Sequence, residues 1–322
     1  MAILVTGGAG YIGSHAAKTL AQAGLQPVVL DNLQRGHREA VQWGPLIEAD
    51  TADQSALERI FREHAIEAVM HFAAFAYVGE SMRDPALYFR NNVANTLTLL
   101  EAMRNCGVRT MVFSSTCATY GNPQRVPISE DHPQHPVNPY GESKLMVERL
   151  LHWFGCIHGL RWTALRYFNA AGADPDGQLG ERHDPETHLI PLAISAAMGR
   201  IEALDIYGTD YDTPDGTAIR DYLHVTDLGE AHVAALRYLG DGGESTAFNL
   251  GTGRGHSVRE VVAMVERVSG RRVPVREVGR RAGDPPCLVA DAGKSAERMK
   301  WHPAHSSLEE IVQTAWNWHH HS

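Results

Sequence analysis

The chain has 322 residues and a formal net charge of −9, and hydrophobic residues make up 43% of it. This length suits one large or two modest domains with an ample buried core. Because acidic and basic residues are interspersed and acids are in excess, the composition argues against a surface for nucleic acid or for an anionic membrane. No apolar run approaches the roughly 20 residues that a membrane-spanning helix needs.

The cysteines and the chain ends indicate an ordinary reducing environment. The cysteines are Cys106, Cys117, Cys156 and Cys287. They lack CxxC spacing, so we expect neither a disulfide framework nor a zinc site, and we predict no metal ligands. The strand-like AILV starts at residue 2 with no basic or cleavable apolar segment before it, which favours a cytoplasmic protein. The terminal run HHHS makes a poor metal site by itself.

The first half of the chain alternates short apolar runs with helical patterns. Strands are predicted at 2–6, 26–31, 67–72, 109–115 and 161–166, and helices near 11–23, 53–64, 91–106 and 139–154. Such alternation, with runs rich in β-branched residues, is typical of a parallel sheet covered on both faces. We therefore predict an α/β fold with a doubly wound parallel sheet.

The character of the sequence changes after about residue 170. The stretch ADPDGQLGERHDPETH is polar, contains glycine and proline, and predicts a long loop into a second region. Helices are predicted near 189–199, 226–239, 257–268 and 307–318, with short strands between them. The run FNLGTG at 248–253 could return to the first sheet. We expect one domain at 1–170, with a return segment near 222–253, and a smaller α/β domain at 171–322.

A glycine-rich turn follows the first strand in the stretch LVTGGAGYIG. GxGxxG is matched by Gly8, Gly10 and Gly13, and GxxGxxG by Gly7, Gly10 and Gly13. Glycines there permit a tight turn and a close approach to a pyrophosphate, which the start of the next helix attracts. Asp31 ends the next strand, where a carboxylate would bind an adenosine ribose and repel a 2′-phosphate. Although Arg35 is close, this pattern favours NAD over NADP, and the alternative is a structural glycine turn.

A helix begins in the stretch NPYGESKLMVERL. Asn138 is a good N-cap, and Pro139 fits the first helical position. Tyr140 and Lys144, at i and i+4, lie on one side of that helix. A cation one turn from a tyrosine stabilises the phenolate and lowers its pKa, as general acid–base catalysis requires. The alternative interpretation is an exposed polar pair.

The strand before this helix ends in hydroxyl side chains. In FSSTCATYG, Ser114, Ser115, Thr116 and Tyr120 follow one another at its carboxyl end. Sites of open α/β sheets lie outside the carboxyl ends of the strands. A hydroxyl there can form a hydrogen bond to a reacting oxygen, although such loops also form local turn bonds.

Together these motifs resemble the extended short-chain dehydrogenase/reductase family and, within it, the UDP-glucose 4-epimerases, also called UDP-galactose 4-epimerases. The similarity runs from TGGAGYIGSH through HFAAFAYVGES, PYGESKLMVE and GTAIRDYLHVTDL to RRAGD. It implies a Rossmann-like NAD-binding domain, a smaller C-terminal domain for a UDP-sugar, and a homodimer formed through the helices near 91–106 and 139–154. The implied reaction interconverts UDP-galactose and UDP-glucose by C4 oxidation, rotation of the 4-keto sugar and re-reduction.

The resemblance also implies roles for single residues. The catalytic positions are matched by Thr116, Tyr140 and Lys144. Positions that hold NAD are matched by Gly7, Gly10, Tyr11, Ile12, Gly13, Asp31, Asn32, Asp50, Thr51, Phe72, Ala73, Asn91, Lys144 and Phe168. Positions that hold the UDP-sugar are matched by Thr116, Tyr140, Asn169, His188, Leu189, Tyr207, Arg220, Arg281, Asp284 and Leu288.

The chemistry of the UDP-sugar positions is consistent with these roles. An arginine such as Arg220 or Arg281 can pair with a diphosphate, Tyr207 can lie against uracil, and Asp284 can accept a ribose hydroxyl. Taken singly, Arg281 is equally a surface charge and His188 a turn residue.

Two positions depart from the best-known pattern of the family. Ala76 stands where some members carry a lysine near the cofactor. Leu288 falls at the position that limits room around the sugar C2 substituent. A leucine there is intermediate in size, so we expect partial acceptance of UDP-GlcNAc and UDP-GalNAc, unless the residue is simply a core leucine.

Other functions remain open at this point. A 4,6-dehydratase would need an acid pair after Thr116, where Cys117 and Ala118 stand. A 4-epimerase of UDP-glucuronate or of a UDP-pentose would use the same catalytic residues. A scaffold that senses NAD without turnover would have no need of Tyr140 or Lys144.

Overall fold

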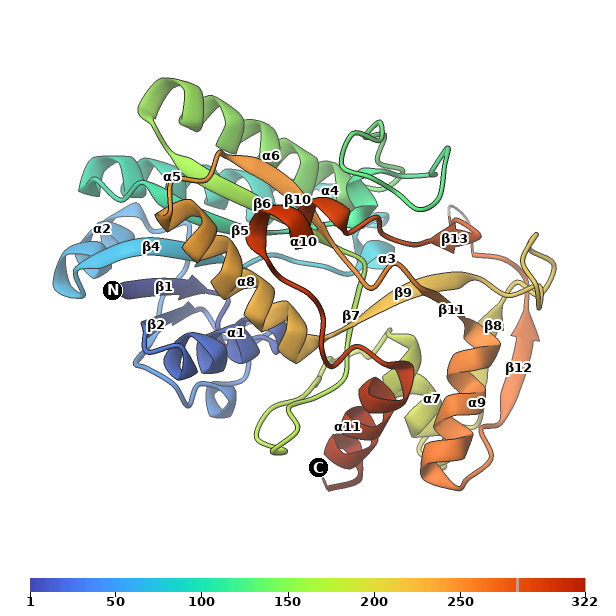
Figure 1. Cartoon of the computed structure of the whole chain (residues 1–322). Helices are drawn as coiled ribbons and strands as arrows, with labels where there is room; N and C mark the ends of the chain where they lie inside the picture. The colour runs from blue at the N-terminus through green and yellow to red at the C-terminus, as the bar shows by residue number, and fades with distance from the viewer. Residues whose placement is uncertain (282–283, 322) are drawn as a thin grey trace.

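The computed structural model describes residues 1–281 and 284–321, and its centre is a seven-stranded parallel sheet (Figure 1). Its strands are β1 Ala2–Thr6, β2 Gln26–Asp31, β3 Leu46–Glu48, β4 Ile66–His71, β5 Thr110–Thr116, β6 Arg161–Tyr167 and β10 Thr246–Leu250. Their spatial order is β10-β6-β5-β4-β1-β2-β3. The order reverses between β1 and β4, and a crevice for a ligand forms at such a switch point.

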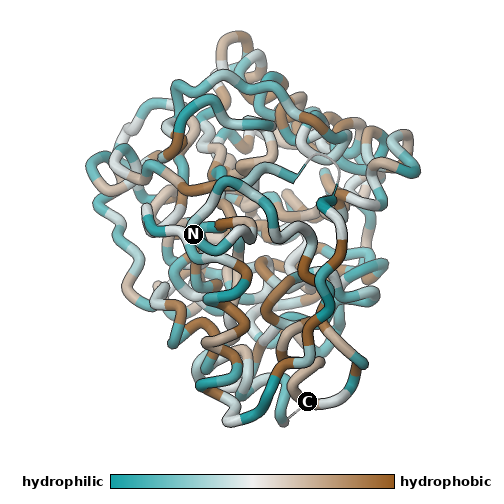
Figure 2. The backbone as a smooth tube through the Cα atoms, turned by 90° about the vertical axis from the view of Figure 1, so that its right-hand side faces the viewer, coloured by the Kyte–Doolittle hydropathy of each residue, from teal (hydrophilic) through white to brown (hydrophobic). Residues whose placement is uncertain are grey.

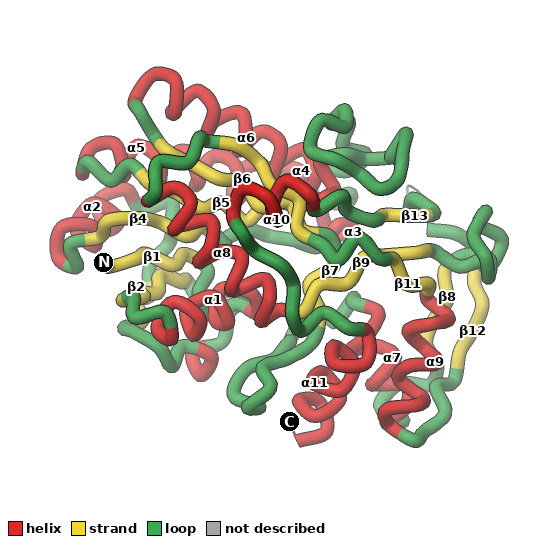
Figure 3. Tube along the Cα trace, viewed as in Figure 1, coloured by secondary structure: helices red, strands yellow, loops and turns green. Residues whose placement is uncertain are grey.

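Helices cover both faces of this sheet (Figures 1 and 3). One face packs on α2 Gln54–Glu63, α5 Asn95–Cys106 and α6 Pro139–His158, and the other on α1 Tyr11–Gln22, α8 Val225–Gly240 and α10 Gly293–Met299. Alternation along β1 sends Leu4 to the first core and Ile3 and Val5 to the second. The predicted doubly wound α/β fold is thereby confirmed.

A smaller group of elements lies beyond the carboxyl edge of the sheet (Figure 1). Strand β9, Ile219–His224, pairs with β7 Asn169–Ala171, β11 Gly255–Ser257 and β13 Cys287–Leu288, while β8 Leu204–Tyr207 pairs with β12 Val275–Val278. Helices α7 Leu189–Ala197, α9 Val258–Ser269 and α11 Leu308–His321 share one apolar core there. Hydrophilic stretches follow much of the outer chain (Figure 2).

The predicted elements differ from the observed ones mainly at their ends. The helix predicted near 91–106 is observed as a π-helical segment Phe89–Ala94 followed by α5, and the short helix α4 Pro85–Tyr88 precedes them. Short elements such as α3 Val78–Ser81 carry too few residues for a periodic signal. Strand β10 and helix α8 join the first sheet although they follow residue 170. The division into domains at that residue stays a prediction.

Among the described residues, the helices lack the combination of length and apolar composition needed to cross a membrane. The four cysteines are free thiols.

Candidate active site

The glycine turn between β1 and α1 brings three backbone segments into close contact. Gly7 has a φ of +71°, and a Cβ added to it would lie 2.6 Å from the backbone nitrogen of Ala73 at the end of β4. A Cβ on Gly13 would lie 2.2 Å from the Gly7 carbonyl oxygen. Helix α1 begins after Gly10 without a side-chain cap. Its first N–H groups are therefore suited to a phosphate.

Acidic and amide side chains follow β2 at the same edge of the sheet. Asp31 is buried, and its two carboxylate oxygens accept the N–H groups of Ala9 at 2.9 Å and Leu33 at 2.8 Å. Burial raises the pKa of Asp31, while these two hydrogen bonds oppose the rise. Asn32 donates to Asp50 at 2.7 Å. Asp31, Asn32 and Asp50 thus lie together near the glycine turn.

The remaining predicted NAD residues lie in varied surroundings. Phe72 contacts the His232 ring with centroids 4.6 Å apart, Asn91 donates to Asn92 at 3.0 Å, and Tyr11 donates to the Gly172 carbonyl at 2.6 Å. Thr51 and Phe168 are buried, and Ile12 is partly buried against the sheet. Ala76, where some family members have lysine, is exposed.

Arg35, which raised the question of a 2′-phosphate, is engaged elsewhere. Its guanidinium pairs with Glu80 at 2.7 Å and lies 5.1 Å from the ring centre of Tyr77. This pairing leaves the Asp31 carboxylate as the group beside the glycine turn.

The helix α6 begins as predicted and carries Lys144 into the core. The Asn138 side chain caps it by accepting the Gly141 N–H at 2.8 Å, and Pro139 occupies the first turn. Lys144 is buried, and its Nζ donates to the Ser114 carbonyl at 2.8 Å. Burial lowers the pKa of Lys144 to about 7, although the charge of Glu148 opposes this.

Tyr140 faces the end of β5. Burial raises the pKa of its phenol, and Tyr167 raises it further, while a hydrogen bond with Thr116 lowers it. The Tyr140 phenol and the Thr116 side chain therefore lie near each other at this end of β5. The expected lowering of the Tyr140 pKa by Lys144 is absent from these side chains, because burial disfavours both the phenolate and the ammonium charge.

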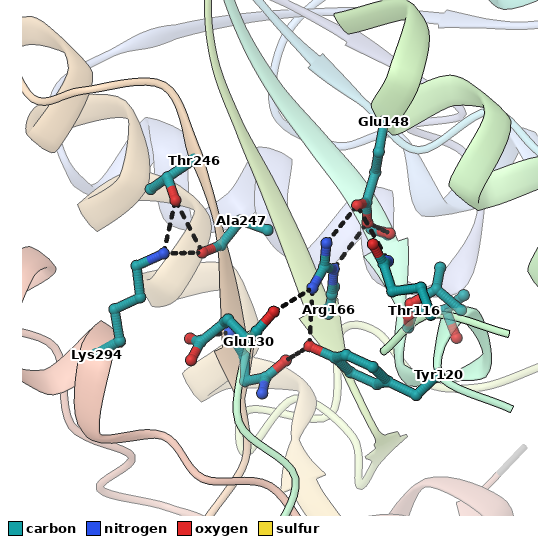
Figure 4. A network of polar contacts seen from close by, with 12 residues as sticks. Thr116, Tyr120, Glu130, Glu148, Arg166, Thr246, Ala247 and Lys294 are labelled. Carbon is teal, nitrogen blue, oxygen red and sulfur yellow. Dashed lines mark hydrogen bonds and ion pairs between the residues drawn. The ribbon is translucent and has the colours of Figure 1, made fainter. Parts of the chain in front are cut away.

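A buried polar network supports this corner of the site (Figure 4). Arg166 donates to both carboxylate oxygens of Glu148, at 2.9 and 2.5 Å, and to the Tyr120 oxygen at 2.9 Å. Ser115 also donates to Glu148, and Tyr120 donates to Asn249. The network joins β5, α6, β6 and β10. The network was not predicted from the sequence, although Glu148 lies one turn after Lys144 on the same face of the helix.

Four of the predicted UDP-sugar residues form two pairs. Arg220 and Asp284 form an ion pair, and the Arg281 guanidinium lies 4.4 Å from the ring centre of Tyr207. Leu288 pairs with Arg220 in the register of β13 and β9. Leu288 also packs against the cluster that contains Cys117 and Phe168, so it lies beside the end of β5.

Three more of these residues lie where β7 and α7 begin. Asn169 starts β7 opposite Tyr222, and Leu189 is the first residue of α7. The ring of His188 instead contacts the buried carboxylate of Glu181.

The model of the NAD dependent epimerase/dehydratase family matches residues 3–251. The chain belongs to this family. The matched range contains the glycine turn, Thr116, Tyr140 and Lys144, so membership and geometry concern the same residues. Gly7 and Gly13 have no Cβ, and Asp31 lies beside the turn that they form. These residues fit the NAD on which the family depends.

Several family members are similar over nearly the whole chain. A UDP-glucose 4-epimerase of Rhizobium leguminosarum bv. trifolii is 52% identical over 317 residues, which cover 98% of this chain and 97% of the relative. The crystal structure of a UDP-glucose 4-epimerase from Brucella ovis in complex with NAD is 55% identical, with a TM-score of 0.96 and coverage of 98% and 97%. A UDP-glucose 4-epimerase from Stenotrophomonas maltophila, with bound NAD and formylated UDP-arabinopyranose, is 40% identical, with a TM-score of 0.97 and coverage of 100% and 98%.

Proposed function

We propose that the chain is an NAD-dependent 4-epimerase that interconverts UDP-galactose and UDP-glucose. The observation that carries the proposal is the placement of Tyr140 and the buried Lys144, one turn apart on α6, against Thr116 and Ser114 at the carboxyl end of β5. The similarity to UDP-glucose 4-epimerases over 98% of the chain supports the same reaction.

Residues of the glycine turn and of the edge beside it would hold NAD. Gly7, Gly10 and Gly13 let the backbone approach the pyrophosphate, and Asp31 accepts from the adenosine ribose. When bound, NAD supplies reversible hydride transfer, which is the redox part of a C4 inversion.

The chain's own side chains supply the acid–base part. Tyr140 removes the proton of the sugar C4 hydroxyl and later returns a proton to the same oxygen. Thr116 forms a hydrogen bond with the reacting oxygen. Lys144, on the same helix as Tyr140, is held by the Ser114 carbonyl, and the positive charge of a bound nicotinamide would favour the phenolate.

The second group of elements would anchor the UDP moiety. Arg220, with Asp284 as its partner, and Arg281, against Tyr207, offer two guanidinium groups for a diphosphate. Anchoring the nucleotide leaves the hexose free to turn, so that its two faces are presented in succession. Binding energy from the remote nucleotide thereby serves the reaction at C4.

Acceptance of N-acetylated sugars is a finer part of this proposal. The side chain of Leu288 packs beside Cys117 and Phe168, near the catalytic end of β5. A leucine leaves more room than tyrosine at that position, so we propose slow turnover of UDP-GalNAc and UDP-GlcNAc.

A UDP-pentose 4-epimerase is the second candidate function. It is favoured by the Stenotrophomonas maltophila relative, which was solved with formylated UDP-arabinopyranose. The proposed catalytic residues are the same for both functions, so only the substrate panel separates them.

We further propose a cytoplasmic homodimer formed through α5 and α6. Helix α6 exposes Trp153 and Ile157, which are 60% and 67% accessible, and Leu97 of α5 is 38% accessible. Exposed large apolar side chains on two neighbouring helices suit a four-helix interface between two copies.

The test is a substrate panel with the NAD-loaded full chain. Conversion of UDP-galactose, UDP-glucuronate and a UDP-pentose is followed by NMR of the sugar anomeric protons. We expect UDP-galactose to be converted most efficiently. Conversion of the pentose alone would transfer the assignment to the second candidate, and NAD binding without any turnover would leave only a scaffold.

A further inference from the structure

A second cluster of titratable side chains lies in the segment between β7 and α7. Glu181, His183, Glu186 and His188 each offer one donor atom, and these four atoms lie within 4.8 Å of one another. They come from the short stretch ERHDPETH, in the pattern E-x-H-x-x-E-x-H. The reaction proposed above uses neither Glu181, His183 nor Glu186.

The imidazoles converge on the carboxylates. The Nδ1 atom of His183 lies 2.8 Å from Oε1 of Glu181 and 3.8 Å from Oε1 of Glu186. The Nδ1 atom of His188 contacts the same Oε1 atom of Glu181. One carboxylate oxygen is thus shared by two histidines, whose ring centres are 5.2 Å apart.

The charge of the cluster calls for a cation. With both imidazoles neutral, the two carboxylates leave a charge of −2, and Glu181 is only 3% exposed. A cation bound among these four side chains would neutralise that charge.

Further hydrogen bonds hold the Glu186 carboxylate and the backbone of Glu181. Oε1 of Glu186 accepts the N–H groups of Thr187 at 2.6 Å and His188 at 2.8 Å. The backbone carbonyl of Glu181 accepts the indole N–H of Trp318 at 3.1 Å. Outer contacts of this kind orient metal ligands and strengthen metal binding.

We propose that Glu181, His183, Glu186 and His188 bind one divalent transition-metal ion, with Zn²⁺ as the ion that the donor set suits best. Imidazole nitrogen and carboxylate oxygen are both zinc ligands, at about 2.0–2.2 Å in tetrahedral sites. Ligand atoms at those bond lengths are about 3.4 Å apart, so small side-chain movements within the observed spread complete the site. This site differs from the prediction of no metal ligands, because its donors are histidines and glutamates and not cysteines.

A metal bound here would hold the segment 172–188 against the part of the chain that is proposed to bind NAD. The His183 ring meets the Tyr11 and Tyr77 rings edge-on, with centroids 6.2 and 5.8 Å away. Tyr11 begins α1 and also donates to the Gly172 carbonyl. The metal is therefore structural, and His188 serves as its ligand in place of the UDP-sugar contact that the family resemblance implied.

The test measures Zn²⁺ binding to the untagged full chain after dialysis against a chelator. Titration calorimetry with Zn²⁺ alone should give about one tight site per chain. Zn²⁺ should also raise the thermal unfolding midpoint by several degrees, about 5 °C or more at saturating metal. The variant His183→Gln/Glu186→Gln should lose this tight site, with affinity at least about a hundredfold lower, and should no longer respond to Zn²⁺ in the melt.

A matched control addresses the histidine run at the end of the chain. The variant His320→Gln/His321→Gln removes two histidines and should keep the tight site. Loss of binding in this control, with retention in His183→Gln/Glu186→Gln, would place the metal on the terminal run and overturn the proposal. Absence of saturable binding and of a melt shift in the wild type would overturn it as well.

Discussion

At the scale of single residues, the proposed catalytic pair depends on the surroundings that bury it. Lys144 and Tyr140 share one side of α6, but desolvation lowers the pKa of the lysine to about 7 and raises that of the tyrosine. Each of the two groups therefore resists its charged form. Added positive charge from a bound nicotinamide would favour the phenolate.

The buried Lys144 predicts a pH dependence of stability. Its pKa is about 7 when folded and near 10.5 when unfolded, so between these values the unfolded chain binds more protons and stability rises with pH. Relative to Lys144→Met, the free energy of unfolding of the wild type should rise by up to about 1.4 kcal/mol per pH unit above pH 7. Urea unfolding of both proteins at pH 7, 8 and 9, at matched NAD occupancy, measures this. Parallel pH profiles would contradict it.

Leu288 predicts a change in substrate preference. Leu288→Tyr should reduce turnover of UDP-GalNAc by about tenfold or more while leaving UDP-galactose turnover within a few fold, because one side chain in an apolar pocket discriminates by about 1–3 kcal/mol. Ratios of kcat/KM for the two sugars provide the measurement. The smaller Leu288→Ala serves as the opposite control and should increase the share of UDP-GalNAc. If wild type shows no GalNAc turnover, the proposed acceptance is wrong.

At the scale of elements, the Glu148–Arg166 network holds α6 in register with β5 and β6. Both partners are buried, and Ser115 and Tyr120 complete their hydrogen bonds. Because Glu148 follows Lys144 by one turn of α6, the same contact helps to fix the position of Lys144, the proposed partner of the base. The network is a positioning device rather than part of the chemistry.

Removing one member of this pair should be costly. Glu148→Ala leaves a buried guanidinium unpaired and should destabilise the fold by about 3–5 kcal/mol. The matched surface variant Asp131→Ala, which breaks the exposed Arg125–Asp131 pair, should cost about 0–1 kcal/mol. Denaturant unfolding of the two variants compares them. Equal losses of unfolding free energy in the two variants would show that the buried Glu148–Arg166 pair stabilises the fold no more than an exposed pair does.

The sequence predicted the long elements well and the short ones poorly. The apolar run AILVT and the amphipathic pattern of α2 are signals contained in the local sequence. The observed ends of β1 and α2 therefore agree with the predicted ends within a residue. Strand β13 has two residues and exists because Cys287 and Leu288 pair with β9, a contact that no local pattern reveals. The Arg166 network likewise joins residues distant in the chain. The cluster of Glu181 and His183 beside Tyr11 forms only when the loop folds back on α1.

At the scale of the whole molecule, the proposed dimer should depend on the apolar surface of α6. Trp153→Glu/Ile157→Glu should shift the protein to a monomer in sedimentation velocity, because two charges would be buried at the interface. Val275 is also apolar and 43% exposed, but it lies on β12, so Val275→Glu should keep the dimer. A wild-type monomer, or a dimer that survives the double substitution, would contradict the proposed interface.

In the proposed reaction Tyr140 is the base, between the edge of the sheet proposed to hold NAD and the elements proposed to anchor UDP. The measurement that tests this most directly is the rate of UDP-galactose conversion to UDP-glucose by wild type, Tyr140→Phe and the distant control Tyr238→Phe, all loaded with NAD. We predict conversion by wild type and control, and a loss of about a hundred- to ten-thousandfold in Tyr140→Phe with NAD still bound. Undiminished conversion by Tyr140→Phe would contradict the account.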